Sequence, residues 1–197
     1  MYLRQRKEIM DEISTCTRCK LHNTRITPVL PCGNPESRIM VIAQSPGETE
    51  NRNGVMFTGP SGKLFYELLE ETGIDRNDLY LTNLIKCMLP GARRPHHGEI
   101  HSCTPFLDLE AELLHPLLQV PLGFHATRYL LKKYRLPVPD RKSVKHLFGL
   151  VLRKDKTIIF PLRHPTALLF NPAKKGIMLT NYHRLHELIS KMKNGQL

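Results

Sequence analysis

Residues 38–47, RIMVIAQSPG, carry the pattern that decides the fold of this chain. A short apolar run rich in β-branched residues, ending in a Pro-Gly turn, is typical of a buried strand that leads into a loop. Runs of the same kind recur at residues 79–85, 117–122 and 157–162. We therefore expect buried strands at these positions.

Helical periodicity fills the intervals between these runs. Leu64 and Leu68 recur at helical spacing, and Gly73 follows as a typical helix end. The expected helices cover residues 61–73, 99–114, 125–134 and 179–192. Alternating strands and helices form parallel sheets with right-handed crossovers. The sequence predicts an α/β fold, a three-layer α/β/α sandwich with a central, mostly parallel four-stranded sheet, in a single domain over residues 1–197.

Composition narrows the class of partner. The 197 residues are 41% hydrophobic and 24% charged, which are globular values. No run approaches the ~20 apolar residues of a membrane span, and the N-terminus lacks the apolar segment of a secretory signal. We expect a cytoplasmic monomer with reduced cysteines and no membrane partner. The net charge of +11 favours a polyanion, nucleic acid above all.

Four of the five cysteines form two separated pairs. Cys16 and Cys19 make a C-x-x-C near the N-terminus, while Cys87 and Cys103 lie in the middle of the chain. Four thiolates hold either one tetrahedral zinc ion or one iron–sulfur cluster. The alternative is two pairs of unrelated buried thiols. Cys32 has no partner and is interpreted as a small core residue or a free thiol.

Three polar segments follow predicted strands, after Ala43, Leu84 and Leu162. Ligand sites in parallel sheets lie beyond the carboxyl ends of the strands, so we expect these segments to converge. The first of them bends at Pro46 and Gly47, which turns backbone N–H groups towards a cavity.

One side chain in or near each segment suits recognition of a planar ligand. Phe57 lies between turn residues, where it either stacks on a ligand or plugs the core. The Asn83 amide offers a donor beside an acceptor, which matches the N3–H/O4 edge of uracil, or it bonds nearby backbone. His164 precedes a proline and either donates a hydrogen bond to an anion or is a structural histidine.

Taken together, these segments resemble the uracil-DNA glycosylase superfamily, and within it the iron–sulfur family 4. The chain carries that family's Thr-Asn-x-x-Lys-Cys at residues 82–87 and its His-Pro-x-x-Leu at residues 164–168. The Phe-x-Gly element with a later glycine stands at residues 56–62, with methionine in place of proline. The family's Gly-Glu-Ala-Pro-Gly-x-x-Glu-Asp corresponds to residues 43–51 in altered form. The four-cysteine pattern matches as well.

The resemblance implies an enzyme that excises uracil from DNA in base excision repair by hydrolysing the N-glycosidic bond. The base must first be flipped out of the stack. Phe57 would then stack on uracil, Asn83 would read its edge, and His164 would bond the anionic O2. Backbone N–H groups near Gln44 and Ser45 would share that charge.

The first motif departs from the family. Its glutamate is Gln44 here, its alanine is Ser45 and its final aspartate is Asn51. A neutral amide positions the attacking water but cannot stabilise a cationic sugar by its charge. Glu48 and Glu50 remain as possible carboxylates, and Glu50, which matches the family's glutamate, is the predicted catalytic one. Gly47 is expected beside the substrate.

The resemblance also implies a DNA-contacting surface. Leu168 or Leu169 would enter the vacated stack as a wedge, unless this apolar run is simply core, and the basic residues nearby would hold phosphates. The predicted DNA contacts are Arg94, Arg163, Leu168, Leu169, Lys174 and Lys175.

The implied cofactor is a [4Fe-4S] cluster, rather than zinc, on Cys16, Cys19, Cys87 and Cys103, which would tie the N-terminal arm to the domain. Two other functions remain open: a non-catalytic or crosslinking binder of uracil-DNA, and an iron–sulfur protein of electron transfer. Residues 93–96, Arg-Arg-Pro-His, resemble a loop with which one related branch captures the sugar covalently. We expect His96 instead to contact DNA or solvent. No sliding clamp or other protein partner is indicated.

Overall fold

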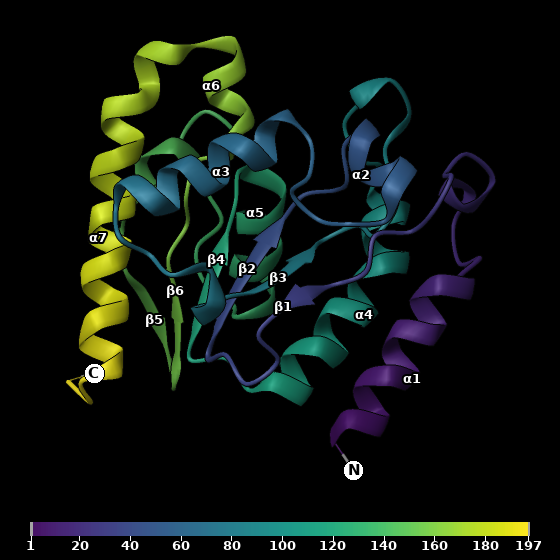
Figure 1. Ribbon diagram of the computed structural model, residues 1–197, viewed down its shortest axis with the longest axis horizontal. Coiled ribbons are helices and arrows are strands. Elements are labelled where there is room, and N and C mark those ends of the chain that lie inside the picture. Colours follow the sequence, from purple (N-terminus) through teal and green to yellow (C-terminus); the bar gives the residue numbers. More distant parts are fainter. Residues whose placement is uncertain (1, 197) are drawn as a thin grey trace.

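A computed structural model describes residues 2–196 as a twisted sheet between two layers of helices (Figure 1). The strand order is β1-β3-β2-β4-β6-β5. The four central strands are parallel. They are β3 (Tyr80–Asn83), β2 (Ile39–Ala43), β4 (Leu118–Pro121) and β6 (Thr157–Ile159). Met1 and Leu197, the ends of the predicted single domain, lie outside the described residues.

The sheet has six strands, so the predicted number of four was wrong. The additional strands are β1 (Cys32–Gly33) and β5 (Leu152–Lys154), which pair antiparallel at the two edges. Neither contains an apolar run, because β1 is only two residues long and β5 is mostly exposed and basic. Short or charged edge strands discourage pairing with another sheet.

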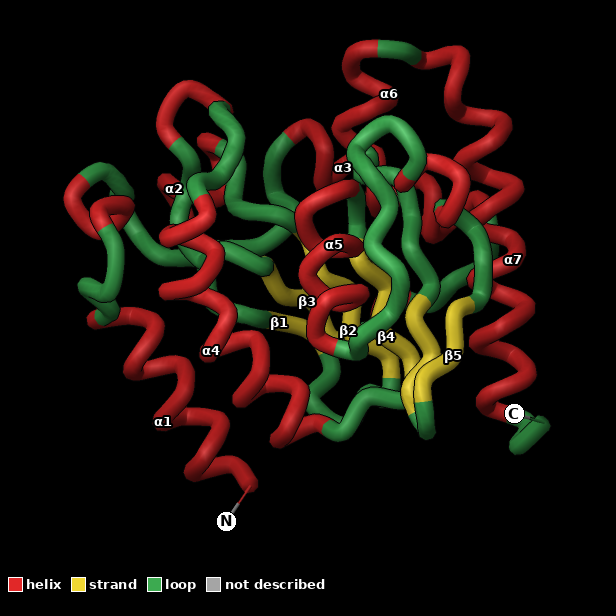
Figure 2. Tube along the Cα trace, turned by 180° about the vertical axis from the view of Figure 1, so that it is seen from behind, coloured by secondary structure: helices red, strands yellow, loops and turns green. Residues whose placement is uncertain are grey.

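Long helices cover both faces of the sheet, and Figures 1 and 2 show the two layers from opposite sides. One layer contains α3 (Pro60–Glu71) and α7 (Lys175–Lys193). The other contains α4 (His97–Leu114) and α5 (Phe124–Lys133), with α1 (Tyr2–Thr15) packed beside α4. The predicted α/β/α sandwich is therefore confirmed.

The two cores follow from the alternation of side chains along β2. Val41 points into one core, with Phe65 of α3, whereas Met40 and Ile42 point into the other, with Phe106 of α4. A strand that is buried on both faces needs an uninterrupted apolar run, which explains why residues 39–43 decide the fold. All five are buried.

The remaining elements are too short for periodicity to predict. Two are α-helices, α2 (Glu48–Asn53) and α6 (Thr166–Phe170). The others are 3₁₀ turns: η1 (Lys20–Asn23), η2 (Arg76–Asp78), η3 (Pro90–Ala92), η4 (Val144–Leu147) and η5 (Pro172–Lys174). Among residues 2–196, no helix combines the length and the apolar character that crossing a bilayer requires.

The carboxyl ends of the parallel strands meet at one edge of the sheet, next to α2 and α6 at the top of Figure 1. Ala43 pairs with Asn83, and a bridge joins Leu122 to Leu162 just beyond β4 and β6. The segments after all four parallel strands therefore begin along this edge, and they include the three that the sequence predicted to converge.

Candidate active site and cysteine cavity

Asn83 is the last residue of β3, and its side chain is only 2% exposed. Its amide nitrogen is buried and has no hydrogen-bond partner among the described residues. Buried polar groups are nearly always paired, and leaving one unpaired costs ~1–3 kcal/mol. The Asn83 amide is therefore an unpaired donor at the carboxyl ends of the parallel strands, available to a ligand.

Phe57 is fixed by its backbone as well as by its ring. Its φ of 55° lies in the left-handed region, and a Cβ on Gly62 would come 2.0 Å from the Phe57 carbonyl oxygen. Only glycine at position 62 lets the first turn of α3 approach the loop this closely. The Phe57 ring stacks on Phe65, with centroids 4.3 Å apart, and is 6% exposed.

Glu50 links the start of the loop between β2 and α3 to its end. Its carboxylate is buried and accepts a hydrogen bond from the Gly59 N–H at 2.8 Å. A Cβ on Gly47 would lie 2.8 Å from the other carboxylate oxygen. The Glu50 carboxylate, which was predicted to be catalytic, is thus bound within the loop itself. Gly47 and Gly59 both pack closely against this carboxylate.

The residues that replace the family's first motif lie around this loop. Gln44 and Ser45 are half-buried directly after β2, and the Gln44 carbonyl accepts the Ile85 N–H at 3.0 Å. Asn51 is buried and uses its side-chain oxygen to accept the Ile26 N–H at 3.0 Å. The amide at position 51 therefore ties the N-terminal arm to α2.

His164 follows β6, and its ring orientation is defined by Thr166. The Thr166 backbone N–H donates to His164 Nδ1 at 3.2 Å, and the Thr166 hydroxyl lies 2.7 Å from the same nitrogen. Because a backbone N–H can only donate, Nδ1 is the acceptor and the proton of the neutral ring is on Nε2. Burial lowers the pKa of His164 to about 4. Near neutral pH the ring is an uncharged donor.

The three predicted recognition residues lie on the same edge but are not equally accessible. His164 lines an open cleft together with Gly123 and Phe124, and neither Phe57 nor Asn83 lines that cleft. Phe57 and Asn83 are almost completely covered. That all three surround one base stays a prediction.

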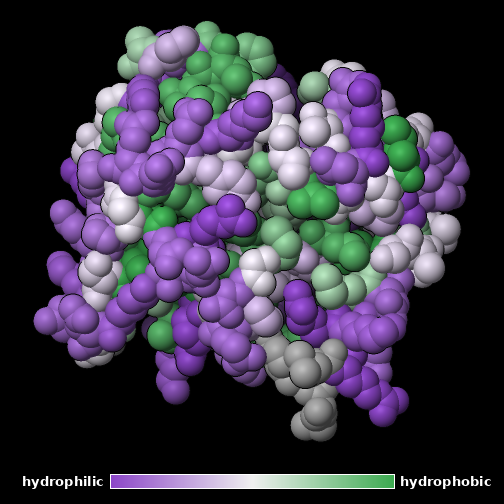
Figure 3. Space-filling view, in the orientation of Figure 1, coloured by the Kyte–Doolittle hydropathy of each residue, from purple (hydrophilic) through white to green (hydrophobic). Residues whose placement is uncertain are grey.

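The apolar run after His164 divides between core and surface. Leu168 is 6% exposed and belongs to the core, whereas Leu169 is 49% and Phe170 85% exposed. Figure 3 shows hydrophobic residues gathered over α6 at the top of the molecule. Of the two leucines predicted as a wedge, only Leu169 is accessible, and Phe170 beside it is more exposed still.

The basic residues predicted to contact DNA differ in their environment. Arg163 lies with its guanidinium carbon 5.1 Å from the centre of the Phe148 ring. Lys175 forms a 2.5 Å ion pair with Glu71, which raises its pKa and makes it less free to hold a phosphate. Arg94 is exposed and Lys174 is half-buried. His96 and His97 are both exposed as well.

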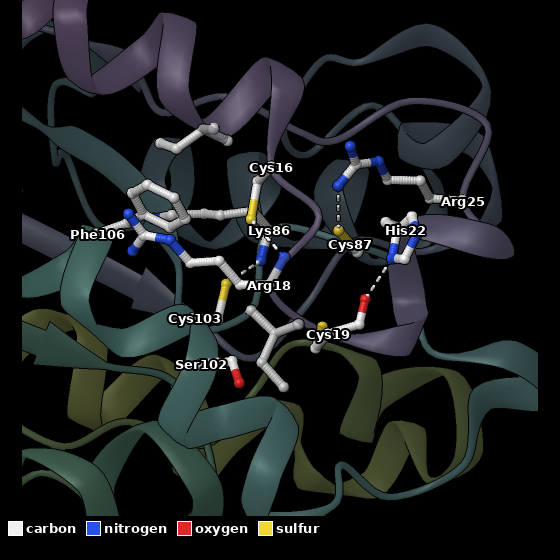
Figure 4. A pocket seen from close by; sticks show the side chains of 12 residues that line it. Cys16, Arg18, Cys19, His22, Arg25, Lys86, Cys87, Ser102, Cys103 and Phe106 are labelled. Carbon is white, nitrogen blue, oxygen red and sulfur yellow. Dashed lines mark hydrogen bonds between the residues drawn. The ribbon is translucent and has the colours of Figure 1, made fainter.

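The four paired cysteines line one cavity. Figure 4 shows Cys16 and Cys19, from the segment after α1, facing Cys87, after β3, and Cys103, on α4. No three His, Cys, Asp or Glu residues within the described chain lie close enough to hold a single metal ion. The cysteines are thus brought together, at a spacing wider than one ion requires.

The sulfur atoms accept hydrogen bonds from nitrogen donors. Arg25 donates to Cys87 Sγ and the Lys86 N–H to Cys103 Sγ, both at 3.2 Å, and a third N–H lies 3.5 Å from Cys16 Sγ. Burial raises the pKa of Cys87 and brings that of Cys103 to about 11. N–H donors stabilise thiolate ligands, so the donor set fits a multinuclear iron–sulfur group bound by all four sulfurs.

Lys86 connects the cysteine cavity to the candidate base-reading residue. Its side chain is 2% exposed, and its ammonium lies 2.5 Å from a Glu110 carboxylate oxygen. The ammonium also donates to Thr82 Oγ1 at 2.6 Å and to the Asn83 carbonyl at 2.9 Å. Sequence reasoning missed Glu110, a charge within an apolar helix segment, and Thr166, although it stands two residues after His164.

Comparison with known proteins identifies the family of this chain. A sequence profile of the Uracil DNA glycosylase superfamily matches residues 30–186. The chain is 34% identical over 197 residues to the Type-4 uracil-DNA glycosylase of Thermotoga maritima. The aligned region covers 97% of this chain and 99% of that protein. The chain is 35% identical to the enzyme of that name from Saccharolobus solfataricus (92% of this chain, 85% of that one) and 34% identical to that from Sulfurisphaera tokodaii (92% and 84%). The chain belongs to the uracil DNA glycosylase superfamily.

Proposed function

We propose that this protein excises uracil from DNA by hydrolysing the bond between deoxyribose C1′ and uracil N1. The relatives named Type-4 uracil-DNA glycosylase support this assignment. The observation that carries it is the buried, unpaired amide nitrogen of Asn83. Uracil offers a carbonyl acceptor at O4, where cytosine has an amino donor. A fixed donor at this point therefore accepts uracil and rejects cytosine.

Phe57 and Asn83 form the recognition part of the proposed site. The Phe57 face away from Phe65 would stack on the flipped base, with the ring already held by its left-handed backbone. The Asn83 amide would pair with O4 and N3–H. Because both side chains are nearly covered, base entry displaces the groups that cover them.

His164 is the proposed electrostatic catalyst. Cleavage leaves negative charge on the uracil oxygens, and the Nε2–H of a neutral imidazole is a donor for O2. One preorganised donor of this kind is typically worth ~3–4 kcal/mol. The backbone N–H groups near Gln44 and Ser45 would add a second interaction.

The loop from 44 to 59 would position the attacking water. Gln44 is the proposed water-positioning residue, and Gly47 allows the backbone to approach the sugar. Glu50 would act through the loop that its carboxylate holds, as a positioning residue, because one of its oxygens binds the Gly59 N–H.

DNA would lie across the carboxyl edge of the sheet. Leu169, together with Phe170, would fill the space that the flipped nucleotide leaves, since Leu168 is in the core. Arg163, Arg94 and Lys174 would hold phosphates.

A [4Fe-4S] cluster is the proposed occupant of the cysteine cavity, held by Cys16, Cys19, Cys87 and Cys103. Such a cluster is also capable of electron transfer, but its proposed role here is structural. The gathering of the four thiols around one cavity and the N–H donors to two of them support this proposal.

The test is incubation of the holoprotein with a uracil-containing oligonucleotide, followed by alkaline cleavage of abasic sites. We expect strand cleavage that falls about 10²-fold or more in His164→Ala and in Asn83→Ala. His183→Ala and Asn194→Ala are matched controls, because they change exposed residues at α7. Retention of the oligonucleotide without cleavage would instead indicate a uracil-DNA binder. No binding at low salt would favour an electron-transfer protein.

A further inference from the structure

Two adjoining clefts extend from His164 along α5, and most of the side chains that line them have no role in the proposed function. The exceptions are Arg94, Arg163 and His164. The first cleft is lined by Gly123, Phe148 and Arg163 among others. The second lies farther along α5. Both are lined by Phe124 and Arg141, so they adjoin at these two side chains. We call the two clefts together the α5 groove.

The α5 groove has an excess of positive charge. Its lining includes seven cationic side chains: Arg94, Arg128, Lys132, Arg141, Lys142, Lys145 and Arg163. In the described part of the chain, none of the seven forms an ion pair. The single carboxylate in the lining, Asp140, accepts the Ser143 N–H at 2.7 Å. Burial and the nearby arginines together lower the pKa of His125 to about 4, which reflects this uncompensated charge.

Aromatic rings alternate with these cations. The guanidinium carbons of Arg141 and Arg128 lie 5.5 and 5.9 Å from the centre of the Phe124 ring, and Arg163 packs on Phe148 in the same way. Both rings are half-buried rather than core residues. Rings and guanidinium planes that stack bases, beside cations that follow the phosphates, are the combination that single-stranded nucleic acid requires.

The walls of the groove come from four separate segments, the first of which is residues 94–95 in the loop before α4. The other three are the start of α5, the loop over residues 134–151, and the segment after β6 that carries His164. Figure 2 shows the loop rising beside α5 towards the carboxyl ends of the strands. The groove therefore begins next to the proposed catalytic histidine and leads away from it.

We propose that the α5 groove binds single-stranded DNA on one side of the target nucleotide, with unpaired bases stacked on Phe124 and Phe148. Its position beside the reacting uracil rests on the proposed function, whereas its affinity for a single strand does not. Duplex DNA keeps its bases stacked on each other, so it cannot use these rings. Single-stranded DNA is therefore the substrate form that gains the additional contacts.

The first test measures binding of uracil-free oligo(dT) by fluorescence anisotropy. We expect Phe124→Leu to weaken binding about 5- to 50-fold, while binding to duplex of the same length changes little. Arg128→Ala with Arg141→Ala should lower the slope of log K against log salt by about 1.4, the value for two phosphate contacts on a single strand. Arg153→Ala with Lys156→Ala, in the β5–β6 hairpin, removes the same charge outside the groove and should leave the single-strand preference intact.

The second test uses single-stranded oligonucleotides with uracil at varied distances from each end. Trimming on one side alone should reduce kcat/KM, and Phe124→Leu should abolish that asymmetry. The proposal would be overturned if trimming on either side reduced kcat/KM equally. It would also be overturned if Phe124→Leu weakened binding to single strand and to duplex by the same factor. Absence of excision from every oligonucleotide would refute the proposed function only, because oligo(dT) binding is measured without uracil.

Discussion

At the scale of single residues, His164 determines how activity should depend on pH. Because burial lowers its pKa to about 4, the ring is already neutral at pH 5 and stays so at higher pH. The step that depends on His164 should therefore be nearly constant from pH 5 to pH 8. Single-turnover excision rates across that range test this. If the rate instead fell as the pH dropped through 6.5, and His164→Gln removed this pH dependence, the imidazole would have an ordinary pKa and the prediction would be contradicted.

The same residue makes stability depend on pH. In the folded protein the pKa is about 4, whereas in the unfolded chain it is about 6.5. Between these values the unfolded chain binds the extra proton, so stability falls as pH drops from 6.5 to 4. The loss is at most about 3 kcal/mol from this residue. Urea unfolding at several pH values should show a smaller loss in His164→Gln, with His125 contributing in the same window.

At the scale of elements, the contact between α3 and the Phe57 loop depends on one missing side chain. A Cβ on Gly62 would lie 2.5 Å from Phe57 Cα and closer still to its carbonyl group. Gly62→Ala should therefore displace the loop, destabilise the protein by about 2 kcal/mol or more, and reduce excision. Gly98→Ala is the control, because its Cβ would meet nothing within 4 Å in α4. Thermal unfolding and single-turnover rates distinguish the two variants.

A second element-scale prediction concerns the ion pair that joins the end of β3 to α4. Lys86→Met leaves Glu110 buried without a counter-charge, which typically costs about 3–5 kcal/mol. Lys86→Met with Glu110→Leu should recover most of that stability, because two apolar side chains replace the pair. Excision should stay low in both variants, since the ammonium also holds the Asn83 carbonyl. Full activity in the double variant would show that Lys86 does not position Asn83.

The sequence predicted the elements whose residues repeat a physical pattern. β2 and α3 were placed within one or two residues, because full burial and helical periodicity leave clear signals. The edge strands β1 and β5 and the short helix α6 leave none. Their positions depend on pairing and packing that only the folded chain contains.

The sequence predicted which residues belong to the candidate site better than it predicted which atoms those residues contact. Asn83 and His164 are named by motifs, but the partners that define their state, Lys86 and Thr166, become visible only in three dimensions. Leu168 and Leu169 are adjacent leucines, and nothing in the sequence separates the core residue from the exposed one. The α5 groove was missed because its cations come from four segments of the chain, from Arg94 to Arg163.

At the scale of the whole molecule, the proposed cluster joins the N-terminal arm to the sheet. The chain after Cys16 and Cys19 is also held to the domain without the cluster, because the Val29 N–H donates to the Lys86 carbonyl at 2.8 Å. Structural metal sites contribute directly to folding energy. Loss of the cluster should therefore loosen the arm before residue 26 and leave the core of the sheet folded.

The double variant Cys16→Ser with Cys19→Ser tests whether the cluster holds the arm. Cys32→Ser is the control, because it changes the thiol that does not line the cavity. The double variant should lose iron, inorganic sulfide and visible absorbance, whereas Cys32→Ser should keep all three. Trypsin should then cleave faster at Arg18, Lys20 or Arg25, because the cluster would hold the backbone around these residues in place. Far-ultraviolet circular dichroism should change little. Full iron content in the double variant would place the cluster elsewhere. Iron loss without new cleavage would mean that packing of α1 on α4 holds the arm by itself.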